Sequence, residues 1–272
     1  RIALARALAS GSKILLLDEP LRALDARLRI DLRKELRAMA REMGLTCVHV
    51  THDQDEALEM ADRIAIIRKG RIIQFGTPME VFDDPATPFV ANFVGRSNIM
   101  SGKVVSSDAG STEVEVGDGL RVKARASDLA PGSEAVVAVK VGFTKLVSAD
   151  DPSFMIGRVE RVLYEGATIT MELMVEGLGL MSAKLPNRKY EDYSVGDAVG
   201  LTWPVGKASV FPMPEGQGPG RGSVARAVGG VSEARRDVPE GGPPAAGALR
   251  RGAAEGGHRP CARFGVEDAH AR

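Results

Sequence analysis

Apolar runs and amphipathic stretches alternate over the first 95 residues of the chain. Lys13–Leu17 is a continuous apolar run, which is typical of a strand buried on both faces of a sheet. Asp25–Met43 follows with apolar side chains every three or four positions, which predicts an amphipathic helix. The residues of that apolar face are Leu28, Leu32, Leu36, Met39 and Met43. Thr46–Val50 then predicts a second buried strand and Asp53–Ala61 a second helix, so the alternation favours an α/β fold with a parallel sheet.

Cap and turn signals mark the ends of the remaining elements in this part of the chain. Gly44 stands where the C-cap residue of the first helix belongs. Arg63–Arg68 and Arg71–Gly76 are strand-like runs, and Lys69-Gly70 between them predicts a hairpin. Thr77-Pro78 predicts the start of a short helix, because proline is favoured in the first turn.

From about Ser97 to Pro212 the pattern changes to short strand-like runs separated by turns. The clearest runs are Ser101–Ser106, Thr112–Val116, Ala135–Val141, Gly157–Tyr164, Thr168–Val175 and Ala198–Trp203. Many short strands at this spacing predict a small all-β barrel or sandwich.

The last segment, Pro214–Arg272, is rich in Gly, Pro and Arg and contains no Lys. We expect it to be disordered, because such a composition buries too little apolar surface to offset its conformational entropy. The predicted organisation is therefore an α/β part at residues 1–95, a β-barrel domain at 96–213 and a tail at 214–272.

Charge and composition restrict the possible partners. The chain carries 36 basic and 36 acidic residues, and this balance argues against a broad electrostatic grip on nucleic acid. Its two cysteines, Cys47 and Cys261, form no CxxC motif, which fits a reducing cytoplasm. The sequence contains no apolar run long enough to span a bilayer, so any role at a membrane requires a membrane-spanning partner.

Candidate chemistry lies where the two predicted parallel strands end. The first strand ends in Asp18 and Glu19 before a proline, and the second is followed by His52. Asp18 is suited to hold Mg²⁺ through water, and Glu19 to polarise the water that attacks a γ-phosphate. His52 would reach the same phosphate from the neighbouring strand. Alone, the acidic pair also fits a solvated turn and the histidine a helix cap, but the paired strand ends favour a site.

These residues resemble the ordered motifs of ABC ATPases. Lys13–Pro20 looks like their Walker B motif, Leu21–Asp25 their D-loop, and Thr51–Ala57 their switch-histidine region, while Arg1–Ala9 is similar to the helix after the LSGGQ signature. The resemblance implies ATP and Mg²⁺ as cofactors and a partial P-loop NTPase fold. It also implies that Asp18 bears on Mg²⁺, Glu19 is the general base and His52 the γ-phosphate switch, and that Asp25 contacts a second copy of the subunit. Arg22 departs from the small residue that is usual in the D-loop.

The 272 residues lack a GxxxxGK[ST] loop, an LSGGQ signature and a Q-loop, and they open inside a helical pattern without a cap. We interpret the sequence as an N-terminally truncated subunit. Because no nest of backbone amides would cradle the β-phosphate, we expect this polypeptide neither to bind ATP tightly nor to turn it over.

The strand-rich region narrows the resemblance to importer ATPases with a C-terminal OB-like TOBE barrel. Phe89–Asn98, Gly157–Gly166 and Val195–Trp203 are similar to the junction and later strands of that barrel, whereas its common Arg-Pro-Glu stretch is missing and Lys140–Phe143 lies near its place. The Leu-Thr-Trp strand and the Ser-Asn junction favour spermidine/putrescine-type importers over sulfate, ferric-iron and sugar-phosphate importers. The resemblance implies membrane-spanning permease subunits, an indirect solute-binding protein partner, and a peripheral location on the cytoplasmic face of the cell membrane.

Two other functions remain open at this point. The chain would serve as a non-catalytic regulatory or dimerisation module derived from such a subunit if it begins naturally near Arg1. A soluble ABC protein of DNA repair or translation is the third possibility, which the C-terminal barrel disfavours.

Overall fold

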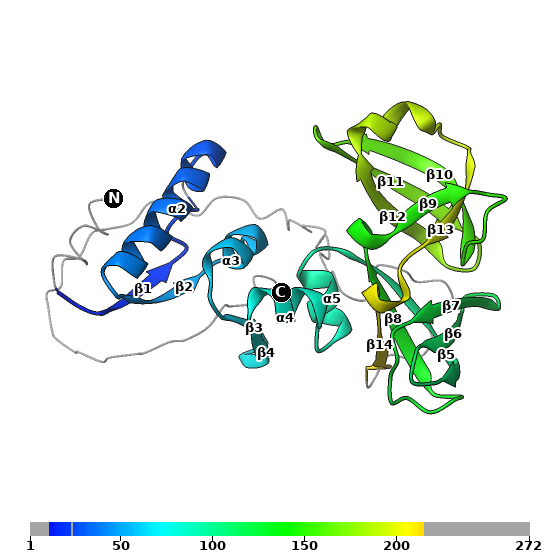
Figure 1. The fold of residues 1–272 in the computed structure, drawn as a ribbon, viewed down its shortest axis with the longest axis horizontal. Helices are drawn as coiled ribbons and strands as arrows, with labels where there is room; N and C mark the ends of the chain where they lie inside the picture. The colour runs from blue at the N-terminus through cyan, green and yellow to red at the C-terminus, as the bar shows by residue number, and fades with distance from the viewer. Residues whose placement is uncertain (1–10, 23, 215–272) are drawn as a thin grey trace, which may run out of the picture.

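The computed structural model describes residues 11–22 and 24–214, which form an elongated molecule (Figure 1). One end holds β1 (Ile14–Asp18), α2 (Ala26–Glu42), β2 (Thr46–Val50) and α3 (Gln54–Met60). The other end consists of strands, so the prediction of an α/β part followed by a small all-β barrel is confirmed. The helix expected at Arg1–Ala9 lies outside the described residues, as does the expected tail apart from Pro214.

The strand pair β1–β2 is parallel, as predicted, with Asp18 opposite Val50. The expectation that these strands are buried on both faces is wrong for the described part of the chain. Leu15 is 8% exposed, but Ile14 and Leu16 on the opposite face are 62% and 67% exposed. Within the described residues, nothing shields the other face from solvent.

Helix α2 lies within one residue of its predicted bounds at each end, and Asp25, which was predicted to be its first residue, instead caps it. The Asp25 side chain accepts a hydrogen bond from the Leu28 N–H, and Gly44 has the positive φ of 60° that a residue following the C-cap requires. Its buried face differs from the predicted apolar one, because Arg33 is buried beside Leu36 while Met43 is half exposed. The helix has 17 residues, and no helix in the described part is long and apolar enough to cross a bilayer.

The middle of the molecule holds the predicted hairpin and two short helices (Figure 1). The hairpin consists of β3 (Ile64–Arg68) and β4 (Arg71–Gly76), joined by two residues with positive φ, as a tight hairpin turn requires. Thr77 caps the following helix through a capping box with Glu80. These helices are α4 (Pro78–Asp83) and α5 (Pro88–Phe93).

The strand-rich end consists of two five-stranded antiparallel sheets. The first has the order β14-β8-β5-β6-β7 and the second the order β12-β11-β10-β13-β9. The first sheet contains β5 (Ser97–Ser107), β6 (Thr112–Val116), β7 (Leu120–Ala124), β8 (Glu134–Lys140) and β14 (Ala208–Pro212). The second contains β9 (Lys145–Ser148), β10 (Met155–Tyr164), β11 (Thr168–Val175), β12 (Gly179–Pro186) and β13 (Ala198–Thr202).

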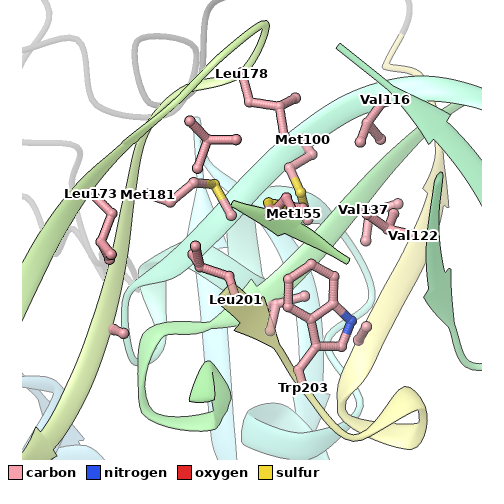
Figure 2. Close-up of a cluster of buried hydrophobic side chains, with 14 of the residues drawn as sticks. Met100, Val116, Val122, Val137, Met155, Leu173, Leu178, Met181, Leu201 and Trp203 are labelled. Atoms are coloured by element: carbon pink, nitrogen blue, oxygen red, sulfur yellow. The ribbon is translucent and has the colours of Figure 1, made fainter. Parts of the chain in front are cut away.

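One hydrophobic core joins the two sheets, and Figure 2 shows its side chains converging from both. Trp203 packs there with its ring centroid 4.7 Å from that of Phe154, and its indole N–H donates to the Lys123 carbonyl. Asn98 links the sheets by polar contacts, because its side chain exchanges two hydrogen bonds with the Ser182 backbone on the opposite sheet. The barrel therefore has an apolar interior with a buried polar cross-link.

Lys140 fastens the short helices to the first sheet. Its buried ammonium donates to the carbonyls of Ala91 and Val94 at the end of α5 and lies 4.5 Å from the Phe82 ring. Burial lowers the pKa of Lys140 to about 8, and the nearby charge of Asp83 offsets only part of this effect. Lys140 thus unites the middle segment with the strand-rich end.

Two substitutions in β1 test the one-sided burial of this strand. We expect Leu15→Ala to lower the free energy of unfolding by about 2–4 kcal/mol, because it empties a covered site. Leu16→Ala removes the same atoms from the exposed face and should change it by less than about 0.5 kcal/mol. Urea unfolding of both variants measures the difference. Equal losses would contradict the exposure of the Leu16 face.

The lowered pKa of Lys140 predicts a stability that depends on pH. Between pH 8 and the ordinary lysine value of 10.5, the unfolded chain holds a proton that the folded protein has released. Stability should therefore rise over this window, by up to about 1.4 kcal/mol per pH unit, relative to a Lys140→Met variant. Parallel unfolding free energies for the two proteins from pH 7.5 to 10 would contradict this prediction.

Candidate functional site

The carboxyl ends of β1 and β2 bring together two of the predicted site residues. The Glu19 N–H donates to the Val50 carbonyl at 2.9 Å, which continues the strand pairing by one residue. His52 comes two residues after the end of the second strand, and its Nε2 lies 2.8 Å from Glu19 Oε1. Ligands of open α/β sheets bind at this edge, so the contact places both groups where a substrate would arrive.

Glu19 is held on both sides of its carboxylate. Its second oxygen, Oε2, accepts a hydrogen bond from Arg22 at 2.7 Å, while Oε1 faces His52. The Glu19 backbone has a φ of 44°, in the left-handed region that is uncommon for a residue with a side chain. Strained backbone of this kind concentrates at functional sites.

Asp18 directly precedes Glu19 in the sequence, and Asp25 follows Glu19 at the start of α2. Asp18 is exposed, and its carboxylate makes no hydrogen bond or ion pair with any described residue, so its oxygens are open to a hard cation. The described residues contain no cluster of three or more His, Cys, Asp or Glu side chains that would hold a metal alone. Asp25 uses one carboxylate oxygen to cap α2, at 2.9 Å from the Leu28 nitrogen.

The buried Glu56 carboxylate contacts the loop that carries His52. Thr51 Oγ1 donates to Glu56 Oε2 at 2.8 Å and accepts from the Asp53 N–H at 3.0 Å. The other oxygen of Glu56 lies 2.7 Å from His49 Nε2, although neither atom has a well-aligned hydrogen bond. Burial lowers the pKa of His49 despite the opposing charge of Glu56. These contacts fix the loop between strand and helix.

A row of arginines on α2 faces the carboxylates of α3 and its flanking residues. Arg29 and Arg33 both contact Asp53 Oδ2, at 3.3 and 2.8 Å, and Arg33 also reaches Glu59 at 3.1 Å. Burial alone would raise the pKa of Asp53. The hydrogen bond from the Glu56 N–H and the charges of Arg33 and Arg29 outweigh burial, so the pKa lies below its ordinary value.

The row continues to the end of the helix. Arg37 donates to the Glu59 carbonyl and lies 3.8 Å from Asp62, which Arg41 approaches at 3.6 Å. Sequence reasoning missed this row and the supporting role of Glu56. The signal was available as four arginines at four-residue spacing, Arg29, Arg33, Arg37 and Arg41, opposite a helix rich in acidic residues.

Comparisons with known proteins match both the barrel and most of the length of the chain. Residues 138–211 match the TOBE domain family. The spermidine/putrescine import ATP-binding protein PotA of Mesorhizobium japonicum is 36% identical over 204 residues, which cover 74% of this chain and 56% of the relative. The protein of the same name from Thermobifida fusca is 44% identical over 171 residues, or 62% of this chain and 44% of the relative.

A third relative of that name, from Marinobacter nauticus, is 35% identical over 228 residues, which cover 80% of this chain and 61% of the relative. The chain thus spans roughly half of the length of the curated relatives that it matches. Both the matched relatives and the barrel point to one family: the chain is similar to ATP-binding proteins of spermidine/putrescine import, and its barrel matches the TOBE domain.

Proposed function

We propose that this chain supplies the hydrolytic carboxylate, the sensing histidine and the TOBE barrel of an ATP-hydrolysing subunit that powers an ABC importer. The single observation that carries the proposal is the 2.8 Å contact between Glu19 and His52 at the adjoining ends of two parallel strands. Such a contact sets a general base beside a group that senses phosphate. The relatives' names, which describe ATP-binding proteins for import, support the same activity.

In this proposal each site residue has a separate task. Glu19 accepts the proton of the water that attacks the γ-phosphate, and His52 donates to a γ-phosphate oxygen while it keeps Glu19 in place. Asp18 is the open carboxylate that would hold Mg²⁺ through water, and the ion supplies positive charge to the terminal phosphates. Asp25 keeps α2 in place by capping and turns its remaining oxygen outwards to a second copy of the subunit.

The proposed partners follow from the family. Two copies of the subunit would close around ATP and reopen after hydrolysis, and this motion would drive membrane-spanning permease subunits between their access states. The solute-binding protein would take part only indirectly, on the far side of the membrane. We place the subunit on the cytoplasmic face of the cell membrane as a peripheral protein.

Polyamines are the solutes that we propose for this importer. The supporting observation is that the matched relatives from three bacteria are named for import of spermidine and putrescine. In this proposal the described site residues act on the nucleotide, so none of them would contact the solute.

The role of Glu19 is tested in a chimera that regains the phosphate-binding loop. The matched region of this chain replaces its counterpart in the Thermobifida fusca relative, and ATP hydrolysis is measured. Glu19→Gln should lower the turnover number by about a hundredfold or more, because it removes the general base while it retains the shape of the side chain. Nucleotide affinity should change little.

Glu35→Gln is the matched control, since Glu35 is an exposed carboxylate on α2 away from the strand ends. It should leave turnover unchanged. A Glu19→Gln chimera that hydrolyses ATP as fast as its parent would refute the assignment. Turnover unaffected by Glu19 but lost with the barrel would favour a regulatory or dimerisation module instead.

A further inference from the structure

Arg29 is the only arginine of the α2 row that contacts both loops of the candidate site. Its two terminal nitrogens point to different partners. One donates to the Leu24 carbonyl at 3.1 Å, in the loop between Glu19 and the helix, and the other donates to Asp53 Oδ2 at 3.3 Å. Leu24 lies in the loop that follows β1 and begins with Glu19, and Asp53 follows His52 directly. A single planar guanidinium therefore joins the loops that follow β1 and β2.

The surroundings of Arg29 hold its guanidinium in this position. Its Nε atom is buried without a hydrogen-bond partner, whereas both terminal nitrogens of the guanidinium donate hydrogen bonds. The Arg29 N–H donates to the Asp25 carbonyl at 3.0 Å, which fixes the start of the side chain in the first turn of α2. Arg33 shares Asp53 Oδ2, but its other contact is to Glu59, away from the first loop.

We propose that Arg29 is a positioning residue that couples the loop of Glu19 to the loop of His52. Among the described residues, Glu19 of the first loop contacts the Val50 carbonyl at the end of β2 and the His52 ring of the second loop. Arg29 adds a further connection through the Leu24 carbonyl and Asp53, so displacement of one loop pulls on the other. Arginine suits this task because its rigid fork binds two acceptors at once, which a lysine ammonium on a flexible stem does not.

The functional meaning of this coupling rests on the proposed function, in which the two loops act on one phosphate. The coupling itself does not need nucleotide, and it is measured on the chain alone. Two hydrogen-bonded amides serve as reporters. The Leu24 N–H donates to the Leu21 carbonyl, and the Asp53 N–H donates to Thr51 Oγ1. The hydrogen-exchange rate of the Leu24 amide reports how well ordered the first loop is, and that of the Asp53 amide reports the same for the second loop.

Arg29→Ala should raise the exchange rate of both reporter amides by about tenfold, the change expected when a charge-assisted hydrogen bond is lost. The NMR signals of the His52 ring should shift as well, although Arg29 does not touch His52. Arg41→Ala is the matched control, because it removes an arginine from the same helix face three turns away. It should change neither reporter nor the His52 signals.

Arg29→Lys keeps the positive charge but removes the two-pronged guanidinium, so it distinguishes a bridging role from a charge effect. It also provides the test if the alanine variant does not fold. The lysine should keep the Asp53 reporter slow through its charge, but the Leu24 reporter should speed up and the His52 signals should shift. Wild-type behaviour of both reporters in Arg29→Lys would overturn the proposal. So would an Arg29→Ala variant in which only the Leu24 reporter responds.

Asp53→Asn completes a double-mutant cycle, since asparagine retains a cap oxygen for the Glu56 N–H and loses the charge. In that background Arg29→Ala should no longer affect the Asp53 reporter but should still speed up the Leu24 reporter. An undiminished effect at Asp53 would also contradict the coupling. These exchange and NMR results do not depend on ATPase activity of the chimera. A failure of the proposed function can therefore be distinguished from a failure of the coupling by Arg29.

Discussion

Parallel hydrogen bonding between β1 and β2 sets the relative position of every group at the candidate site. The register places Asp18 opposite Val50, so the chain leaves both strands at the same level. Glu19 and His52 therefore emerge at one edge, where their side chains meet at 2.8 Å. Because side chains alternate between the faces of a sheet, a slip of one residue would turn one of the two away from the other.

Electrostatic contacts hold that edge together where apolar contacts are few. The Glu19 carboxylate lies between Arg22 and His52, and the Asp53 carboxylate between Arg29 and Arg33. Each such pair near the surface contributes little alone. Together they add to the contacts between the loops that follow β1 and β2. The barrel, by contrast, is stabilised by a continuous apolar core, so the two ends of the molecule depend on different forces.

Local signals in the sequence predicted most of the elements. Asp25, Gly44 and Thr77 act as caps because a cap needs only its own turn of helix. The adjoining strand ends followed from the βαβ pattern, which requires parallel strands. The open face of β1 could not be predicted, because an apolar run has the same composition whether one or both of its faces are covered.

The contacts between charged side chains also could not be predicted from the sequence. Arg29 and Arg33 look like solvated positions on a helix until α3 is placed beside them with Asp53 at its start. Arg22 stood out only as an unusual residue in its loop, and nothing in the sequence indicated its contact with Glu19. Pairing between side chains distant in sequence is decided by tertiary packing, and one sequence does not record it.

The contact between Glu19 and His52 is tested most directly by NMR of the protein with labelled histidine. The ring ¹⁵N signals of His52 are compared between the wild type and Glu19→Gln, with His49 as an internal reference because it contacts Glu56 instead. The account predicts that the substitution shifts the His52 signals and leaves those of His49 in place. Unchanged His52 signals would show that the two strand ends do not bring these groups together.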